Sequence, residues 1–207
     1  MAIKKYEALV IGAGLAGIAA ARELHAAGVD LLLLDKRKRV GGRMATRRIG
    51  QGAADHGAQF FTAESPEFQA LVDGWEAEGF AYLWDIGWST GSFTDNEGPD
   101  HTHYAVSGGM SRLMEHLAVD LPTETAVSVV AVRQIDGGWE AEAKDGSRYR
   151  SSGLILTPPP PQALQLLRAG DVHLSPMDAE ILEQLTYSST ITGIFRIEGE
   201  VTIPAPG

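Results

Sequence analysis

The opening of the chain alternates between two hydrophobic patterns. Glu7–Ile11 and Leu31–Leu34 are short and mainly apolar, which is typical of strands in a parallel sheet covered on both faces. Between them, Leu15–Ala27 has the length of a helix with small residues on one side, and Gly28 is placed to end it. The pattern predicts a strand–helix–strand unit.

Helical spacing returns at Ser65–Glu78, where Pro66 suits a first turn, and at Gly109–Leu117. A further helix is expected over Gln162–Leu167, after a run of four prolines. The side chains expected to face the core are Phe68, Leu71, Val72 and Trp75 in the first of these helices and Met110, Leu113, Met114 and Leu117 in the second.

Strand patterns occupy much of the remaining chain. Ala126–Val132 and Trp139–Ala143 alternate around the turn Asp136-Gly137-Gly138 and predict a hairpin. Between Asp35 and about Phe61 the chain is rich in Gly and Arg, and we expect an ordered loop and a short helix. The other expected strands are short antiparallel ones within Phe80–Tyr104, a buried one at Leu154–Leu156 and one at Ile191–Ile197.

The composition narrows the class of protein. With 17 basic and 27 acidic residues the net charge is −10, which argues against binding to nucleic acid. The chain has no cysteine, so any redox chemistry requires a bound cofactor. Lys4 and Lys5 before the apolar stretch Ala8–Ala21 resemble a secretory signal, but a signal needs no glycines at fixed places. We therefore expect a cytoplasmic protein without a membrane segment.

A glycine-rich turn follows the first predicted strand. Its Gly-x-Gly-x-x-Gly spacing allows a tight turn, a close approach of the backbone to a pyrophosphate, and tight packing of helix on strand. Asp35 lies 18 residues after the last of these glycines and is placed to accept hydrogen bonds from ribose hydroxyls. A tight turn without a ligand is the plain alternative. The predicted dinucleotide-binding residues of the turn are Gly12, Gly14, Leu15, Ala16 and Gly17.

Basic residues cluster directly after Asp35. The stretch Lys36–Arg48 holds seven of the 17, and Arg43 follows two glycines, where its guanidinium is expected to reach a pyrophosphate oxygen. A solvated loop is the alternative for most of the stretch. A basic residue beside Asp35, such as Lys36, also suits a 2′-phosphate, which leaves NADP as an alternative ligand.

Several phrases together resemble a known family. Leu34-Asp35-Lys36 followed by Gly41-Gly42-Arg43-Met44-Ala45-Thr46 is similar to the flavin-dependent amine oxidase superfamily, and within it to the renalase-like family. The resemblance continues through Asp55–Thr62, Val106–Ser111, Val129–Val132 with Trp139, Leu156–Gln162 and Tyr187–Ser189, so it covers nearly the whole chain.

The resemblance implies an α/β fold and FAD as the cofactor. A Rossmann-like FAD-binding domain, with three layers around a central parallel sheet, is expected over 1–62 plus 105–160. A partial, mixed-sheet substrate domain is expected over 63–104 plus 161–207. The residues implied to bind the ADP part are the glycine turn, Asp35, Lys36, Gly42 and Arg43; Ala58, Gln59 and Phe60 are expected along the flavin and the backbone of Val129 at the adenine, and Met44 and Thr157 complete the set.

The implied reaction is oxidation of isomeric dihydronicotinamides, which are NAD(P)H forms reduced at the wrong ring carbon, by hydride transfer to FAD and then to oxygen. An amine oxidase or a desaturase of the same superfamily is an alternative, so the expected partner is a small molecule, either a nicotinamide dinucleotide or an amine. A non-catalytic dinucleotide-binding module is the second alternative.

Few side chains are candidates for chemistry, because hydride transfer from an electron-rich donor mainly requires that the two rings be oriented. No acid or base is assigned. His56 is a candidate near the flavin, with a loop-bonded histidine as the alternative. His101 and His103 have no third partner, so no metal site is predicted. Trp84, Trp88, Phe93 and Tyr104 suit either an aromatic wall over the flavin or core packing.

The end of the chain departs from the family pattern. Flavoproteins of this kind close the FAD site with a Gly-Asp phrase near the C-terminus, and we expect that no segment after Thr157 supplies this contact. The chain stops at Ile203–Gly207, soon after the last predicted strand. We therefore expect a C-terminal portion to be missing.

Overall fold

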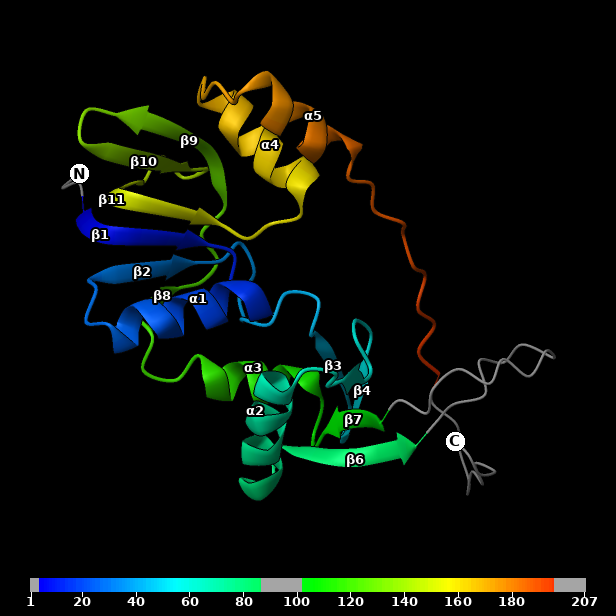
Figure 1. Ribbon diagram of the computed structural model, residues 1–207. Helices are drawn as coiled ribbons and strands as arrows, with labels where there is room; N and C mark the ends of the chain where they lie inside the picture. The colour runs from blue at the N-terminus through cyan, green and yellow to red at the C-terminus, as the bar shows by residue number, and fades with distance from the viewer. Residues whose placement is uncertain (1–3, 87–101, 196–207) are drawn as a thin grey trace. The chain divides into compact units, whose positions relative to one another are not determined.

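The computed structural model describes residues 4–86 and 102–195, and the chain divides into two compact units (Figure 1). Unit 1 comprises Met1–Gly42 and Met114–Thr190, and unit 2 comprises Arg43–Leu113 and Ile191–Gly207. The helix α3 (Met110–Leu117) begins in unit 2 and ends in unit 1.

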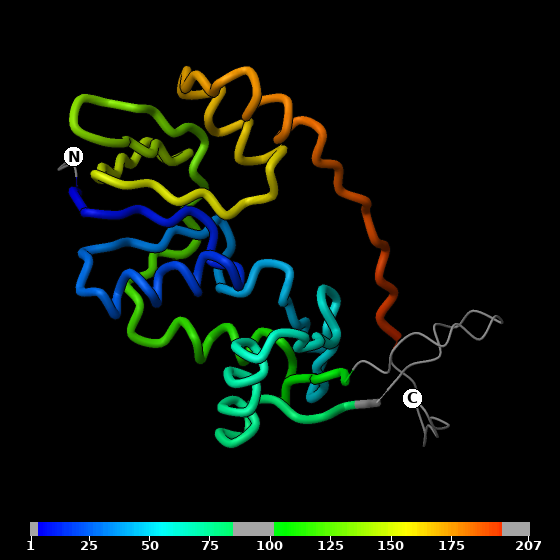
Figure 2. Tube along the Cα trace, viewed as in Figure 1, coloured from blue at the N-terminus to red at the C-terminus, as the bar shows by residue number. Residues whose placement is uncertain are grey.

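Unit 1 is built on a six-stranded sheet in the order β8-β2-β1-β11-β10-β9. Its strands are β1 (Lys4–Ile11), β2 (Leu31–Leu34), β8 (Thr123–Glu124), β9 (Val129–Ile135), β10 (Gly138–Ala143) and β11 (Arg148–Leu156). The chain trace shows β11 beside β1, to which it is parallel (Figure 2). Because β11 also pairs antiparallel with β10, it joins the parallel part of the sheet to the β9–β10 hairpin.

The predicted strand–helix–strand unit is confirmed. The helix α1 (Leu15–Ala26) connects β1 to β2, and the two strands are parallel. All four leucines of β2 are buried, as expected for a strand covered on both faces. Gly28 follows the helix with φ +75°, a conformation that glycine adopts without the steric cost of a Cβ.

The core of unit 1 draws apolar side chains from distant parts of the chain. Leu9 and Ile11 of β1 pack in one cluster with Leu34 of β2, Val132 of β9 and Tyr149 of β11. The helix α4 (Pro160–Ala169) contributes Leu167 to this cluster and packs against β9 (Figure 1). The hairpin and the parallel strands therefore share one core.

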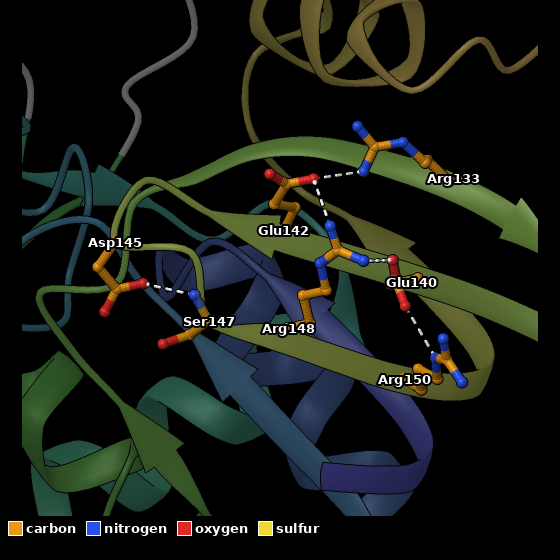
Figure 3. A network of polar contacts seen from close by, with 7 residues as sticks. All are labelled: Arg133, Glu140, Glu142, Asp145, Ser147, Arg148 and Arg150. Atoms are coloured by element: carbon orange, nitrogen blue, oxygen red, sulfur yellow. Dashed lines mark hydrogen bonds and ion pairs between the residues drawn. The ribbon is translucent and has the colours of Figure 1, made fainter. Parts of the chain in front are cut away.

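Charged side chains stabilise the pairing of β9, β10 and β11. Glu140 and Glu142 project between the arginines of the neighbouring strands (Figure 3). Glu140 is buried and accepts a hydrogen bond from Arg150 Nε at 2.8 Å, and Arg148 Nη1 lies 3.5 Å from it. Arg133 Nη1 donates to Glu142 Oε2 at 2.6 Å, and this bond lowers the pKa of Glu142. Opposite charges face each other across each strand pair, which favours this register.

The described part of unit 2 contains two small sheets, one complete helix and the start of α3. One sheet is the antiparallel hairpin of β3 (Thr46–Ile49) and β4 (Gly52–Asp55). The other has the order β5-β7-β6, from β5 (Phe61–Thr62), β7 (Thr102–Val106) and β6 (Ala81–Ile86). The helix α2 (Pro66–Ala77) begins after Ser65, whose side chain accepts a hydrogen bond from the Phe68 amide.

Several predicted elements are confirmed and others are wrong. The helices at α2, α3 and α4 are confirmed, as is the β9–β10 hairpin. The short helix expected between Asp35 and Phe61 is absent, because the chain there forms the β3–β4 hairpin. Leu71, expected in the core, is 55% exposed, whereas Val72 and Trp75 are buried. Ile191–Phe195 are not a strand, and the rest of that predicted strand lies outside the described residues.

The compact units differ from the predicted domains. Residues 43–62 and 105–113 group with unit 2, because β3 pairs with β4, and β5 and β7 pair in the second small sheet. Residues 161–190 group with unit 1, because α4 packs on β9 and on α5 (Pro176–Gln184), a helix that the sequence analysis missed. The division into a cofactor domain and a substrate domain stays a prediction.

The stability of unit 1 is expected to depend on Tyr149 at high pH. Tyr149 is buried and donates a hydrogen bond to Glu124 Oε2 at 2.9 Å. Burial and this bond raise the pKa of Tyr149 from 10.0 to about 12. A raised pKa contributes stability that is present below pH 10 and is lost as the pH rises toward 12.

Urea unfolding of the wild type should therefore show a free energy of unfolding that falls between pH 10 and about 12. In Tyr149→Phe that fall should be smaller by about 1–2 kcal/mol, since one pKa unit corresponds to about 1.4 kcal/mol. Tyr82→Phe, at an exposed tyrosine, is the control. Equal pH profiles for the wild type and Tyr149→Phe would contradict this role.

Candidate dinucleotide-binding site

The turn between β1 and α1 is shaped by two glycines that the protein itself requires. Gly12 has φ +103°, and a Cβ there would lie 2.5 Å from Thr157 Oγ1. A Cβ at Gly17 would lie 1.8 Å from the Gly12 carbonyl oxygen, so only glycine lets α1 pack this close to the turn. The tight turn and the close helix–strand packing predicted for these positions are both present.

Gly14 is different, because no protein atom nearby requires a glycine. Its φ of −82° is ordinary for any residue, and a Cβ there would meet only the Gly42 Cα, at 3.9 Å. A Cβ would therefore fit at Gly14 in ordinary van der Waals contact with Gly42. An absent side chain at this point suits a ligand that approaches the backbone closely, as a pyrophosphate does in the Gly-x-Gly-x-x-Gly turn.

The start of α1 is suited to an anion. No side chain caps this helix, and its first turn contains no acidic residue. The amides of a helix start carry partial positive charge and lack acceptors within the helix. The turn therefore directs the amides of Leu15, Ala16 and Gly17 toward the end of the sheet where a phosphate group is expected.

Asp35 lies directly after β2 and is 7% exposed. Its Oδ2 accepts a hydrogen bond from the Ala13 amide at 2.7 Å, and its Oδ1 accepts one from the Arg37 amide at 2.7 Å. A carboxylate oxygen can accept two hydrogen bonds, so each oxygen keeps capacity for a ribose hydroxyl. The bond to the turn joins residues 22 positions apart, so the sequence gives no sign of it.

A second loop of unit 1 packs against the turn. The Gly41 amide donates to the Ala13 carbonyl at 2.7 Å, and a Cβ at Gly42 would lie 3.0 Å from the Gly14 Cα. Arg37 Nη1 closes this loop by donating to the Gly42 carbonyl at 2.8 Å. Lys36 is exposed, and its Nζ lies 3.2 Å from Gln162 Oε1 at the start of α4. Gly42 of the second loop therefore lies against Gly14 of the turn, and both are predicted cofactor-binding residues.

The segment expected at the adenine also runs beside Asp35. The Val127 amide donates to the Asp35 carbonyl at 2.9 Å, and the Ala126 amide donates to the Arg37 carbonyl at 2.7 Å. Two residues later, Val129 begins β9 and is partly buried against the core. Ala126 has φ +60°, which is strained for a residue with a Cβ. This segment thus follows the edge where the ribose is expected.

In unit 2, the segments Arg43–Ala45 and His56–Ala58, which both belong to phrases that resemble the family, lie side by side. The His56 amide donates to the Ala45 carbonyl at 3.2 Å, and the Ala58 amide donates to the Arg43 carbonyl at 2.9 Å. A Cβ at Gly57 would lie 1.8 Å from the Arg43 carbonyl oxygen, so this close pairing requires glycine. Met44, between the two paired residues, is partly buried.

The same hairpin holds the start of α3. Asp55 Oδ1 accepts hydrogen bonds from Thr46 Oγ1 and from the Met110 amide, and Thr46 Oγ1 accepts one from the Ser111 amide at 2.9 Å. Gly109 has no side chain to cap the helix, and a Cβ there would lie 2.4 Å from Thr46 Cγ2. Thr46 and Asp55 therefore supply the cap, which the sequence analysis missed.

The remaining candidates of unit 2 are more exposed. His56 and Gln59 are exposed, and Ala58 is partly buried. The ring centroid of Phe60 lies 4.5 Å from that of His103 and 5.9 Å from that of Trp84. His103 Nδ1 is buried and has no hydrogen-bond partner within the described part of the chain. Tyr104 stacks on Phe61 in the packed core of this unit.

His101, Trp88 and Phe93 lie outside the described residues. Within residues 4–86 and 102–195, no three potential metal ligands gather at one point. Over the same ranges, none of the helices combines the length and the hydrophobicity that crossing a membrane requires. The predicted site residues thus form two groups. The turn, Asp35, Lys36, Gly42, Val129 and Thr157 lie in unit 1, and Arg43, Met44, His56, Ala58, Gln59 and Phe60 lie in unit 2.

The parallel strands, the glycine turn and the acid after β2 define a Rossmann-like α/β fold. The comparisons with known proteins agree. Residues 10–75 match the family described as NAD(P)-binding Rossmann-like domain. The solved structure of wild-type putrescine oxidase bound to putrescine is similar with a TM-score of 0.68 at 17% sequence identity, over 88% of this chain and 64% of that one.

Curated relatives match over a shorter segment. Putrescine oxidase of Kocuria rosea is 40% identical over 67 residues, which are 32% of this chain and 14% of that protein. Lysine-specific histone demethylase 1 homolog 3 of Oryza sativa subsp. indica is 47% identical over 58 residues, which are 26% of this chain and 7% of that protein. The chain therefore matches only a small part of the length of these relatives.

Two glycine substitutions separate a ligand site from a structural turn. Gly14→Ala should leave the free energy of unfolding within about 0.5 kcal/mol of the wild type, since the new Cβ meets no close atom. It should weaken binding of ADP or FAD at least about tenfold, because the methyl group occupies the place of the phosphates. Titration calorimetry and urea unfolding measure the two effects.

Gly17→Ala is the matched control for packing. Its Cβ would overlap the Gly12 carbonyl oxygen, so this variant should lose stability whether or not a ligand is present. A Gly14→Ala variant that binds ADP as tightly as the wild type would contradict a phosphate site above Gly14.

Proposed function

We propose that this chain holds FAD within an oxidoreductase of the flavin-containing amine oxidase type. One observation carries the proposal: position 14, at the start of a helix without a side-chain cap, holds a glycine although the protein has room for a Cβ there. Protein packing alone would allow a side chain at this position. A dinucleotide pyrophosphate accounts for both the glycine at this position and the helix start without a side-chain cap.

The resemblance of the phrase Gly41–Met44 to flavin-dependent amine oxidases favours FAD over a nicotinamide dinucleotide as the resident ligand. Gly41 and Gly42 pack on the turn, and Arg43 follows them directly, where a guanidinium suits a pyrophosphate oxygen. A sequence relative supports the same choice, since a putative flavin-containing monoamine oxidase of Mycobacterium tuberculosis is 48% identical to this chain over 66 residues. The Rossmann-like turn by itself suits either dinucleotide.

The residues present fit such a cofactor. The turn and α1 would hold the pyrophosphate, Asp35 the ribose, and the segment leading to Val129 the adenine. Bound FAD would supply a hydride acceptor, and the chain's own residues would position it. The phrase Ala58–Phe60 is proposed to lie along the flavin ring, with the aromatic pair Phe60 and His103 next to it.

An amine is the favoured substrate, because the similar proteins include putrescine oxidase, which was solved bound to putrescine. The renalase-type oxidation of isomeric dihydronicotinamides is the second candidate, and the phrase Asp55–Gln59 favours it. Both reactions transfer a hydride to a flavin. The protein must therefore orient either a dihydronicotinamide ring or an amine against the flavin ring.

The purified protein, reconstituted with FAD, tests the proposal by its visible spectrum. An oxidised-flavin spectrum that persists through gel filtration is the expected result. Anaerobic bleaching by putrescine or another amine would select the amine oxidase reaction, and bleaching only by isomer-containing NADH would select the dihydronicotinamide reaction. Protein that retains no flavin would overturn the proposed function, and protein that retains flavin but is bleached by neither substrate would favour the non-catalytic module.

Arg43 provides a residue-level test. Arg43→Ala should weaken FAD binding about tenfold, because a charge-assisted hydrogen bond to a phosphate contributes about 1.5–3 kcal/mol. Arg48→Ala removes the same charge from an exposed position of β3 and is the matched control. Flavin fluorescence quenching measures both affinities, and equal losses in the two variants would mean that only net charge matters.

A further inference from the structure

Thr157, which directly follows β11, directs its hydroxyl at the turn. Its Oγ1 lies 3.0 Å from the Ile11 carbonyl oxygen and 2.9 Å from the Gly12 carbonyl oxygen, and its own amide donates to the Ile11 carbonyl at 3.0 Å. The single hydroxyl proton is donated to one of the two carbonyls at a time. Thr157 therefore contacts the carbonyl groups at the start of the glycine turn through both its side chain and its backbone.

The same hydroxyl fills the space that two glycines leave open. A Cβ at Gly12 would lie 2.5 Å from Thr157 Oγ1, and a Cβ at Gly17 would lie 3.0 Å from it. The absent side chains at Gly12 and Gly17 thus make room for Thr157 and for the helix. This packing distinguishes them from Gly14, above which the protein leaves space.

Thr157 and Asp35 hold opposite ends of one peptide group. The carbonyl of Gly12 accepts from Thr157 Oγ1, and the amide of Ala13, which belongs to the same peptide, donates to Asp35 Oδ2 at 2.7 Å. Asp35 comes from the end of β2 and Thr157 from the end of β11, on either side of β1. The orientation of this peptide is therefore set by hydrogen bonds from both neighbouring strands.

A turn of this kind needs such restraint. Gly12 has φ +103°, and without a Cβ a glycine backbone has more accessible conformations than the backbone of any other amino-acid type. Rotation of the Gly12–Ala13 peptide would change the path of the chain into Gly14 and α1. Restraint in the free protein reduces the ordering cost of binding, which increases affinity.

We propose that Thr157 is a positioning residue for the phosphate-binding turn, acting opposite Asp35 on the Gly12–Ala13 peptide rather than as a direct ligand of the cofactor. The inference rests on the proposed function, since it assigns how the turn is kept ready for a dinucleotide. It follows that removal of the Thr157 hydroxyl should weaken dinucleotide binding, although the hydroxyl does not contact the ligand.

The test compares three variants at a temperature where circular dichroism shows each to be folded. Thr157→Val keeps the shape and removes the hydroxyl, and Thr157→Ser keeps the hydroxyl. Thr123→Val is the matched control, because Thr123 Oγ1 donates to the Leu121 carbonyl at 3.0 Å elsewhere on the sheet. ADP and FAD are titrated into each by calorimetry.

Thr157→Val should bind both ligands about tenfold more weakly, because without the hydroxyl the Gly12–Ala13 peptide is mobile in the free protein and must be ordered on binding. Thr157→Ser should stay within about twofold of the wild type, and Thr123→Val should be unchanged. A general loss of stability would not lower the affinity of protein that remains folded. Wild-type affinity in folded Thr157→Val would overturn the inference.

A measurement on the wild type keeps the inference testable if Thr157→Val does not fold. Hydrogen exchange of the Ala13 amide in the ligand-free protein should be slow, because the peptide is held before any ligand binds. Exchange as fast as in an unstructured chain would overturn the inference. Failure of the wild type to bind FAD or ADP would instead contradict the proposed function, so the two failures are distinguishable.

Discussion

The Gly12–Ala13 peptide is the point on which the candidate site depends. Its amide is held by Asp35 and its carbonyl by Thr157, both at hydrogen-bond distance. Neither contact exists without the sheet, since parallel pairing of β1 with β2 brings Asp35 to the turn and parallel pairing with β11 brings Thr157. The fold of unit 1 therefore positions the turn as well as supporting it.

The glycines of the turn serve two different purposes, because some are required by protein packing and one is required only by a ligand. Gly12 and Gly17 are needed by the protein, because side chains there would collide with Thr157 or with the turn itself. Gly14 is needed only if something approaches from outside the chain. The motif is commonly treated as one signal, but here its positions respond to different constraints, and only one of them points directly to a ligand.

Local patterns were sufficient to predict much of unit 1. The leucine run of β2, the helix ending at Gly28 and the glycine spacing depend on neighbouring residues, so α1, β2 and the turn are where the sequence places them. The likeness to the putrescine oxidase structure over 88% of the chain agrees with the predicted α/β fold. The position of Leu71 was wrong because helical spacing alone does not show which side of α2 another element covers.

Contacts between distant residues could not be predicted in this way. In place of the β3–β4 hairpin, an ordered loop and a short helix were expected, because the chain there is rich in Gly and Arg and β4 contains no β-branched residue. The cap that Thr46 and Asp55 provide for α3 joins segments far apart in the chain. The hydrogen bond that Asp35 accepts from the Ala13 amide could not be predicted either. An acidic residue after β2 predicts a ribose contact, but nothing in the sequence indicates that the same carboxylate also binds the turn.

The central claim is that the turn and the start of α1 bind the phosphates of an adenine dinucleotide. Backbone amide chemical shifts recorded by NMR during a titration with ADP test it most directly, because they report on each turn residue separately. The account predicts that the amides of Ala13–Ile18 show the largest shifts and saturate together. A folded protein whose turn amides do not move at saturating ADP would contradict it.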